Sequence, residues 1–306
     1  MNYIPIRIGT LRPDNVISFD VYVQVAEKYI HYIRQADAFD GDRISRLKAK
    51  GIKKLYIAEE AEALYLQYLD AGLDQLKDTK IETVRRETIV RDTMVTDAEN
   101  AERNVQTEQG YQRTEDRMKK VVEFLTSSES VARNIMSAAG FSQDNFQHCA
   151  NVSTLALGMA NLLGITKTSD LVEIGLAALL HDIGYSKFDF NARVPLDQMS
   201  VEQLNKYKEH PIEGARMLAD KPYVTKGVLE LIADHEEIGE GLGFPNKKRL
   251  STMRRSSQIL NLANDYDRYA HLKQKSHKEI AKQFFQDKIG AFDLNHIKFL
   301  VSLFKN

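Results

Sequence analysis

This 306-residue sequence has little cysteine, little excess charge and no long apolar run. Its single cysteine, Cys149, excludes a disulfide within the chain and suits a reducing compartment, so we expect a cytoplasmic protein. The formal net charge of −1 offers no electrostatic basis for binding a nucleic-acid polymer. No stretch approaches the roughly 20 apolar residues that a membrane helix needs, and we expect neither membrane association nor a secretory signal.

Proline is absent between Pro13 and Pro195, which favours a helix-rich middle. Residues 1–80 have a different pattern, because the segments IPIRIGTL, FDVYVQVAEKYIHYI and KKLYIAEE carry Ile, Val and Tyr in the partial alternation of strands. Between them, GDRISRLKAKG predicts a short helix that ends at Gly51. We therefore expect a small α+β domain over residues 1–80, acting as a regulator or as a dock for a signalling partner.

The remaining chain is predicted to be helical. Residues 81–125 are highly charged, poor in Gly and Pro, and only sparsely apolar, which predicts an exposed helical linker. From residue 126 to residue 306, apolar residues recur at i, i+3 and i+4, as in Leu155, Met159 and Leu162. The expected fold class is mainly α: an all-helical C-terminal bundle of at least five core helices, preceded by the small α+β domain.

Seven of the eight histidines follow residue 140, and four of them lie in apolar helical stretches. These are His148, His181 with its neighbour Asp182, His210 and His235. Converging helices can carry such side chains inward to one point. A lone histidine on an apolar helix is more often a core residue than a ligand, but neutral imidazole and carboxylate together bind divalent metals. A buried aspartate also needs a cation beside it, so this ordered set predicts a metal site.

The order H…HD…H…H…D resembles the HD superfamily of metal-dependent phosphohydrolases, and more narrowly the HD-GYP domain of bacterial cyclic-di-GMP phosphodiesterases. HDIGYSK is similar to the family's HDIGK, HPIEGARML to its HPxxGxxxL, and HEEIGEGLGFP to its HHExxDGxGYP. SSQILNLANDYDRY resembles its metal-binding IxxxADxxDAL helix. The resemblance covers residues 125–306. It implies a helical metal-binding domain with phosphodiesterase activity related to cyclic-di-GMP signalling.

The sequence departs from this pattern at several positions. Glu236 stands where the family has its second His, Glu240 replaces Asp, Phe244 replaces Tyr, and Tyr185 replaces the Lys after HDIG. The family's RPYR-like segment is not recognisable. These family residues help to bind the dinucleotide, so two functions stay open: a metal-dependent phosphodiesterase, or a degenerate metal-binding signalling module with little or no cyclic-di-GMP hydrolysis. A third, weaker option is an HD phosphohydrolase acting on nucleotides.

The resemblance implies two metal ions. One is expected to bind His148, His181, Asp182 and Asp265, and the other Asp182, His210 and His235. Mixed His and carboxylate ligation without Cys favours iron or manganese over structural zinc.

The ligand in ANDYD is ambiguous. Direct alignment puts Asn264 at the metal position and Asp267 at the second carboxylate, whereas a one-residue shift puts Asp265 on the metal. We favour Asp265, because a carboxylate is the better ligand for a hard cation. Glu236 is a further candidate ligand where the family uses His. Asp144 is a candidate for a third metal, although a helix N-cap is the stronger interpretation of its position.

The expected chemistry uses Asp182 as the carboxylate shared by the two metals, which together activate a hydroxide for attack on phosphorus. Lys187 is a candidate phosphate contact in place of the family's lysine, with an exposed loop lysine as the alternative. Phe244 keeps the family's ring for stacking on a base but lacks the hydroxyl. We expect cleavage of a generic phosphodiester and weak or absent activity on cyclic-di-GMP.

Overall fold

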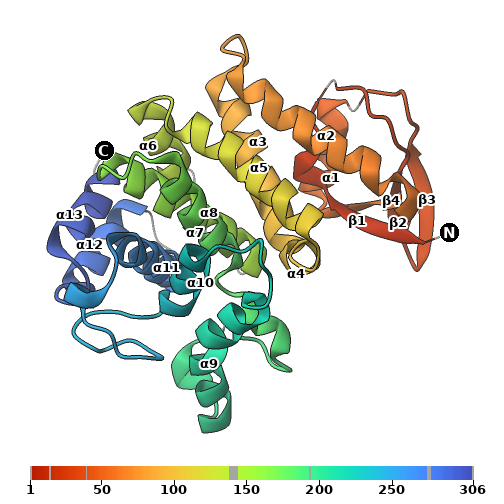
Figure 1. The fold of residues 1–306 in the computed structure, drawn as a ribbon. Helices are drawn as coiled ribbons and strands as arrows, with labels where there is room; N and C mark the ends of the chain where they lie inside the picture. Colours follow the sequence, from red (N-terminus) through yellow and green to blue (C-terminus); the bar gives the residue numbers. More distant parts are fainter. Residues whose placement is uncertain are drawn as a thin grey trace. The chain divides into compact units, whose positions relative to one another are not determined.

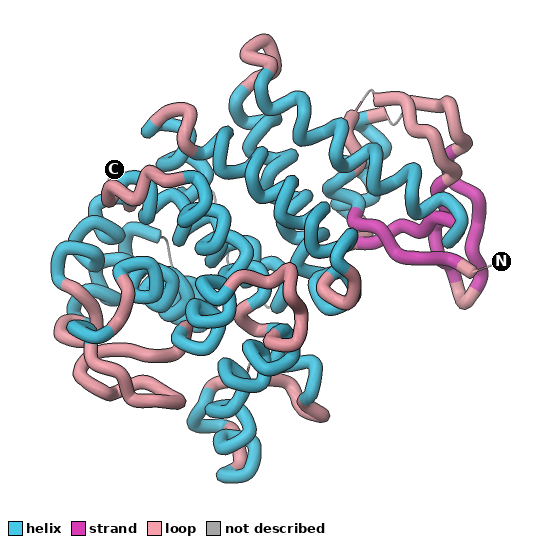
Figure 2. Tube along the Cα trace, viewed as in Figure 1, coloured by secondary structure: helices cyan, strands magenta, loops and turns pink. Residues whose placement is uncertain are grey.

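The computed structural model describes residues 2–13, 15–38, 40–137, 144–192, 194–273 and 277–304. The chain divides into two compact units, residues 1–96 and residues 97–306 (Figure 1). Within the described ranges the structure is mainly helical, with thirteen α-helices and one four-stranded sheet. Figure 2 shows that the strands all belong to the first unit. The expected fold class is therefore confirmed.

The first unit contains an antiparallel sheet in the order β1-β4-β2-β3. The strands are β1 (Tyr3–Arg7), β2 (Val21–Val25), β3 (Lys28–Ile33) and β4 (Lys54–Ala58). Alternation along the strands buries one set of side chains, including Ile6, Leu55 and Ile57. Helix α1 (Gly41–Ala49) is capped by the Asp40 side chain, which accepts a hydrogen bond from the Asp42 N–H at 2.9 Å. It is the short helix predicted from the sequence.

The boundary between the units falls after residue 96, inside the segment expected to be an exposed linker. That segment forms α3 (Thr83–Glu99), α4 (Ala101–Asn104) and α5 (Glu108–Leu125), after α2 (Glu62–Asp74). Helix α5 is not an exposed linker, because Tyr111, Met118 and Val121 are buried. A stripe of apolar residues three or four apart is enough to bury one face of a helix, even when its other residues are charged.

The second unit continues through eight helices. They are α6 (Glu129–Ser137), α7 (Asn145–Leu162), α8 (Thr168–Leu180), α9 (Val201–Leu218), α10 (Lys226–Asp234), α11 (Arg255–Lys273), α12 (His277–Lys288) and α13 (Leu294–Leu303). Helix α7 packs against both α8 and α11, and its buried residues occur on all sides. Gly175 allows α8 to pack closely against α5, because a Cβ at this position would lie 2.3 Å from the Met118 sulfur of α5. The contacts of α8 with α5 and α7 fix the positions of His148 in α7 and of His181 at the end of α8.

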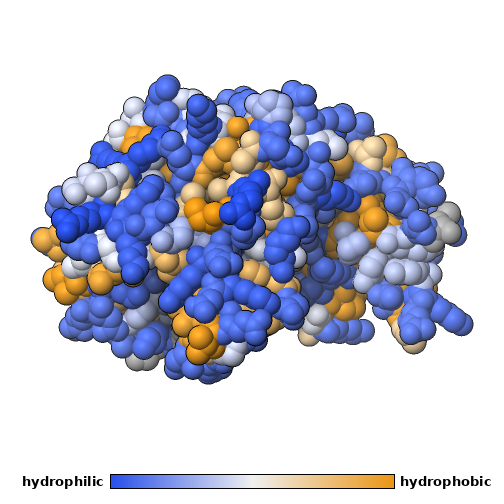
Figure 3. Space-filling model, turned by 60° about the horizontal axis from the view of Figure 1, so that its bottom comes forward, coloured by the Kyte–Doolittle hydropathy of each residue, from blue (hydrophilic) through white to orange (hydrophobic). Residues whose placement is uncertain are grey.

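The face of the molecule drawn in Figure 3 is largely polar. On the face drawn in Figure 3, apolar residues are interspersed among hydrophilic ones. Across the described residues, we find no helix with both the length and the apolarity needed to cross a bilayer.

Candidate metal centre

Four histidines and one aspartate converge inside the second unit from four separate helical elements. They are His148 in α7, His181 and Asp182 at the end of α8, His210 in α9, and His235 at the end of α10. All five are buried, with exposed fractions of 0 to 3%. The apolar residues before His181 (AALL) and before His235 (Leu231 and Ile232) are buried in the core, so they carry these two polar side chains inward.

Backbone carbonyl groups orient three of the imidazole rings. The Nδ1 atoms of His181 and His235 lie 2.7 Å from the carbonyl oxygens of Ala178 and Ile232. Both histidines cap the C-terminus of a helix, where carbonyl groups lack intrahelical partners. Because a carbonyl oxygen only accepts, each Nδ1 carries a proton, and each Nε2 is directed into the cluster.

The ring of His210 is oriented in the middle of a helix by a different device. Its Nδ1 donates to the Tyr207 carbonyl oxygen at 2.5 Å. That oxygen is available because Pro211, which would otherwise supply the i−4 helical hydrogen bond, has no N–H. The His-Pro pair of the sequence thus determines the tautomer of His210.

The Nε2 atoms meet in two pairs. Those of His210 and His235 are 2.8 Å apart, and those of His148 and His181 are 3.2 Å apart. Burial lowers the pKa of His210. Burial also lowers the pKa of His235 well below 6.5, and the neighbouring rings of His210 and His181 add to this effect. Two neutral rings with protonated Nδ1 atoms place lone pairs against each other at 2.8 Å, which is repulsive unless a cation binds them. The donor set therefore fits a divalent metal ion.

Asp182 lies between the two histidine pairs. Its Oδ1 is 3.3 Å from His181 Nε2, 3.5 Å from His210 Nε2 and 3.8 Å from His235 Nε2. Its Oδ2 is 3.8 Å from His148 Nε2. Burial would raise the pKa of Asp182, but the surrounding histidines, His181 first, hold it well below 3.8. Asp182 is thus an ionised carboxylate common to two triads, His148–His181–Asp182 and Asp182–His210–His235, each with ligand atoms within 4.8 Å of one another.

Helix α11 brings Asn264, not Asp265, to the cluster. Asn264 Oδ1 lies 3.1 Å from His148 Nε2, whereas Asp265 Oδ2 is paired with Lys288 Nζ at 2.7 Å. Asp267 lies behind His148 and accepts from its Nδ1 at 2.6 Å. The expectation that Asp265 is the ligand does not agree with this arrangement. Residues 264 and 267 share a helix face, and residue 265 is rotated by about 100° from residue 264.

Glu236, the residue in place of the family's second His, is bound by a cation. Arg268 donates to both of its carboxylate oxygens, and the Tyr207 hydroxyl and the Asn264 amide each donate to Oε1 at 3.2 Å. Burial would raise the pKa of Glu236, but Arg268 lowers it to about 2. Its Oε1 is 3.8 Å from His235 Nε2. Sequence analysis missed Arg268, although its i+4 spacing from Asn264 is a visible signal.

The remaining candidates lie around this cluster. The Phe244 ring centroid is 6.2 Å from that of His210 and 5.8 Å from that of Tyr207, so Phe244 lies beside the centre. Lys187 is exposed at the end of a 3₁₀ turn, Ile183–Lys187. Asp144 caps α7, accepting from the Phe146 N–H at 3.0 Å, as its N-cap interpretation predicts.

The glycine of HDIG allows this 3₁₀ turn to approach α9. A Cβ on Gly184 would lie 2.3 Å from the His210 carbonyl oxygen. The close approach puts the Tyr185 ring centroid 4.5 Å from that of His210. Tyr185, Tyr207 and Arg268 then line a small cavity of about 40 Å³ next to the cluster.

Comparisons with known proteins agree with this geometry. The family model described as HD domain matches residues 111–284. The cyclic di-GMP phosphodiesterase PA4108 of Pseudomonas aeruginosa is 31% identical over 103 residues, which are 33% of this chain and 25% of that protein's length. The solved structure of Bd1817, an HDG"Y"P protein from Bdellovibrio bacteriovorus, is 33% identical, with all of both chains covered and a TM-score of 0.84.

Proposed function

Since this chain belongs to the HD domain family and is an HD-GYP protein, we propose that it is a metal-dependent phosphodiesterase that cleaves a cyclic dinucleotide or another phosphodiester. The observation that carries the proposal is Asp182, a buried carboxylate shared by two triads of metal-ligating side chains. A carboxylate shared in this way can hold two metal ions close together, as two-metal phosphoryl-transfer sites have them.

We propose that two divalent ions, iron or manganese, bind here. His148, His181, Asp182 and Asn264 would hold one ion, and Asp182, His210 and His235 the other. Glu236 lies next to the second set, close to His235. When bound, the ions lower the pKa of a water molecule and neutralise charge on the phosphoryl oxygens.

The chain's own groups keep this ligand set in position. The carbonyl oxygens of Ala178, Tyr207 and Ile232 hold the Nδ1 protons of three rings, and Asp267 holds that of His148. Such outer partners fix the tautomer and orientation of metal-ligating histidines. Phe244 and Lys187 remain our candidates for contacts with the substrate, by stacking and by charge respectively.

One observation favours the second candidate function, a metal-binding signalling module with little cyclic-di-GMP hydrolysis. Glu236 is neutralised by Arg268 and does not offer an imidazole at the position where HD-GYP domains have one. Phe244 also lacks the hydroxyl of the family's Tyr. We therefore expect cleavage of an activated phosphodiester but weak or absent cyclic-di-GMP turnover.

The test compares wild type with Asp182→Ala in iron- and manganese-loaded samples, on bis(p-nitrophenyl) phosphate and on cyclic-di-GMP. Asp220→Ala is the matched control, because the Asp220 side chain is 82% exposed. We expect two metal ions per chain in wild type and Asp220→Ala, with activity on the first substrate that Asp182→Ala loses. Equal background rates in all three proteins would leave only the signalling module.

A further inference from the structure

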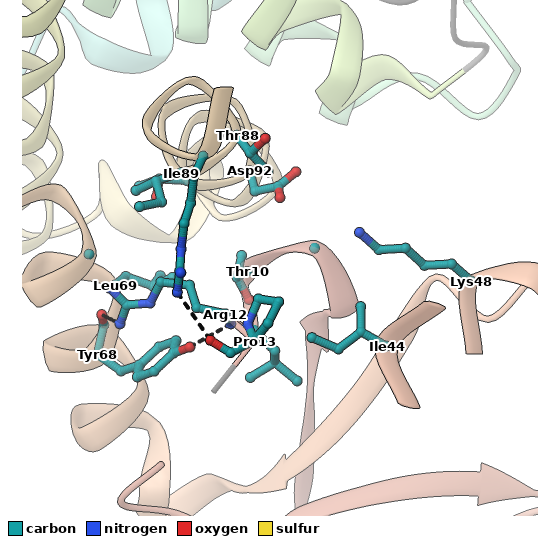
Figure 4. A pocket seen from close by; sticks show the side chains of 15 residues that line it. Thr10, Arg12, Pro13, Ile44, Lys48, Tyr68, Leu69, Thr88, Ile89 and Asp92 are labelled. Atoms are coloured by element: carbon teal, nitrogen blue, oxygen red, sulfur yellow. Dashed lines mark hydrogen bonds between the residues drawn. The ribbon is translucent and has the colours of Figure 1, made fainter. Parts of the chain in front are cut away.

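The first unit contains a cavity of about 250 Å³ (Figure 4). Four segments of that unit line it: residues 9–13, α1, α2 and the first part of α3. Much of its wall is apolar, from Leu11, Pro13, Ile44, Leu69 and Ile89. Pockets for small molecules typically have such apolar walls with a few polar groups that orient the ligand. This cavity is slightly smaller than the usual range of roughly 300–1,000 Å³, so it suits a small ligand.

Arg12 brings a buried positive charge to this cavity. Its side chain is only 7% exposed, and its Nη2 donates to the Tyr68 carbonyl oxygen at 2.7 Å. Its Nε and Nη1 atoms are buried and have no hydrogen-bond partner in the described chain. Nor does any carboxylate of the described residues form an ion pair with it. The Tyr68 ring faces the guanidinium, with its centroid 3.9 Å from Arg12 Cζ, but a ring does not neutralise the charge. A buried cation without an anion is costly, which points to an anionic ligand.

The other charged residues of the lining give the cavity a positive balance. Arg85 Nη2 donates to the Pro13 carbonyl oxygen at 3.1 Å, so its charge is bound by a neutral group. Lys48 is exposed and adds a third cation to the lining, and Asp92 adds a carboxylate. In Figure 4 the Lys48 amino group and the Asp92 carboxylate extend toward one another from α1 and α3. Three cations against one carboxylate leave an excess of positive charge.

Asp92 limits how much negative charge the ligand can carry. A Cβ on Gly9 would lie 2.8 Å from the Asp92 carboxylate atoms, so the glycine makes room for that carboxylate against the backbone. Burial raises the pKa of Asp92, whereas Arg91, Lys48 and Arg7 lower it, and the ionised carboxylate repels a ligand anion. A second full charge on the ligand would add to the repulsion.

We propose that this cavity binds a small organic carboxylate, with its charged end at Arg12 and its apolar body against Leu69 and Ile89. A charge-assisted hydrogen bond from a guanidinium to a carboxylate is among the stronger polar contacts in proteins. This binding site is an addition to the metal centre and does not depend on its activity.

The first experiment measures binding to the full chain by isothermal titration calorimetry. Benzoate and octanoate are the carboxylate probes, benzamide is the uncharged analogue of benzoate, and phenyl phosphate is the dianionic one. We expect saturable one-site binding of a carboxylate, with benzamide and phenyl phosphate at least about tenfold weaker. Failure of wild type to bind either carboxylate, or tighter binding of phenyl phosphate, would overturn the proposal.

Two variants test whether Arg12 is responsible. Arg12→Gln removes the charge but also the hydrogen bond to Tyr68, so its folding is checked by circular dichroism. Gly72→Ala keeps the charge and moves it, because the new Cβ would lie 2.6 Å from Arg12 Nη1, while alanine favours the surrounding helix. Lys53→Gln, at an exposed lysine outside the lining, is the control.

We expect Gly72→Ala, and Arg12→Gln if it folds, to weaken carboxylate binding by at least about tenfold, and Lys53→Gln to bind as wild type does. Unchanged binding by Gly72→Ala would refute the role of Arg12, whether or not Arg12→Gln folds.

Discussion

The Nε2 atoms of His210 and His235 lie 2.8 Å apart in two buried rings whose Nδ1 protons are held by backbone carbonyl oxygens. The two rings come from different helices, and neither can relieve the contact by exchanging tautomers without losing its backbone hydrogen bond. The folded chain thus holds two lone pairs in a geometry that only a cation stabilises. Metal binding and folding stability are therefore expected to be coupled.

Metal removal should destabilise the protein. A chelator is expected to lower the melting temperature of wild type, and manganese or iron to restore it, because an ion that binds only the folded chain adds about 2.7 kcal/mol at a concentration 100 times its Kd. Differential scanning calorimetry measures the shift. His235→Ala should show a smaller response and bind fewer ions by elemental analysis. A response of wild-type size in His235→Ala would contradict the assignment of that ligand.

The neighbouring residues Asn264 and Asp265 should behave differently. Asn264→Ala is expected to reduce the metal content or the metal affinity, because its Oδ1 lies 3.1 Å from His148 Nε2. Asp265→Ala should keep the metals and lose only a partly exposed ion pair with Lys288, worth up to about 1 kcal/mol. Elemental analysis and urea unfolding distinguish the two. If Asp265→Ala loses an ion and Asn264→Ala does not, Asp265 is the ligand, as the sequence analysis expected.

The Glu236–Arg268 pair should contribute to stability through charge. Arg268→Gln leaves Glu236 buried with no cation, and breaking a buried ion pair costs about 3–5 kcal/mol. Urea unfolding of the metal-free chain measures this cost. The double variant Glu236→Gln/Arg268→Gln should be less destabilised than Arg268→Gln alone, since no unpaired charge remains. A double variant as unstable as the sum of the two single variants would show that the pair is not coupled.

The same pair predicts a pH dependence. Arg268 lowers the pKa of Glu236 from 4.5 to about 2 in the folded chain, although burial acts in the opposite direction. A lowered folded-state pKa contributes stability above the unfolded value, so this contribution should be complete above pH 4.5 and disappear as the pH falls to about 2. The difference in unfolding free energy between wild type and Glu236→Gln should shrink over that range. A constant difference would contradict the assignment.

Burial of α5 can be tested at its ion pair with the end of α3. Arg117 Nη1 lies 2.5 Å from Asp97 Oδ1, and both side chains are 4% exposed. Asp97→Asn should destabilise the chain by about 3–5 kcal/mol in urea unfolding, because Arg117 then lacks its carboxylate in a buried position. Asp116→Asn, at a 58% exposed partner of Lys119 on the same helix, should cost no more than about 1 kcal/mol. Equal destabilisation by the two substitutions would indicate that α5 is an exposed linker.

The sequence by itself determined the helical character of the second unit and the set of residues at its centre. Helical periodicity is a local property, and His148, His181, Asp182, His210 and His235 are polar residues that occur where apolar stretches predict a core. The choice between Asn264 and Asp265 was also within reach, since the 100° step of a helix separates them. Ligand chemistry favours Asp265, whereas helix geometry favours Asn264, which shares a face with Asp267.

Only the tertiary structure decided the other features. Four features depend on residues that lie far apart in the sequence: the burial of α5, the boundary after residue 96, the pairing of Glu236 with Arg268, and the buried position of Arg12 against Tyr68. A charged residue has the same local pattern whether it faces solvent or a distant partner. The outcome is determined by the packing that surrounds it, because burial makes an unpaired charge costly and a paired one tolerable.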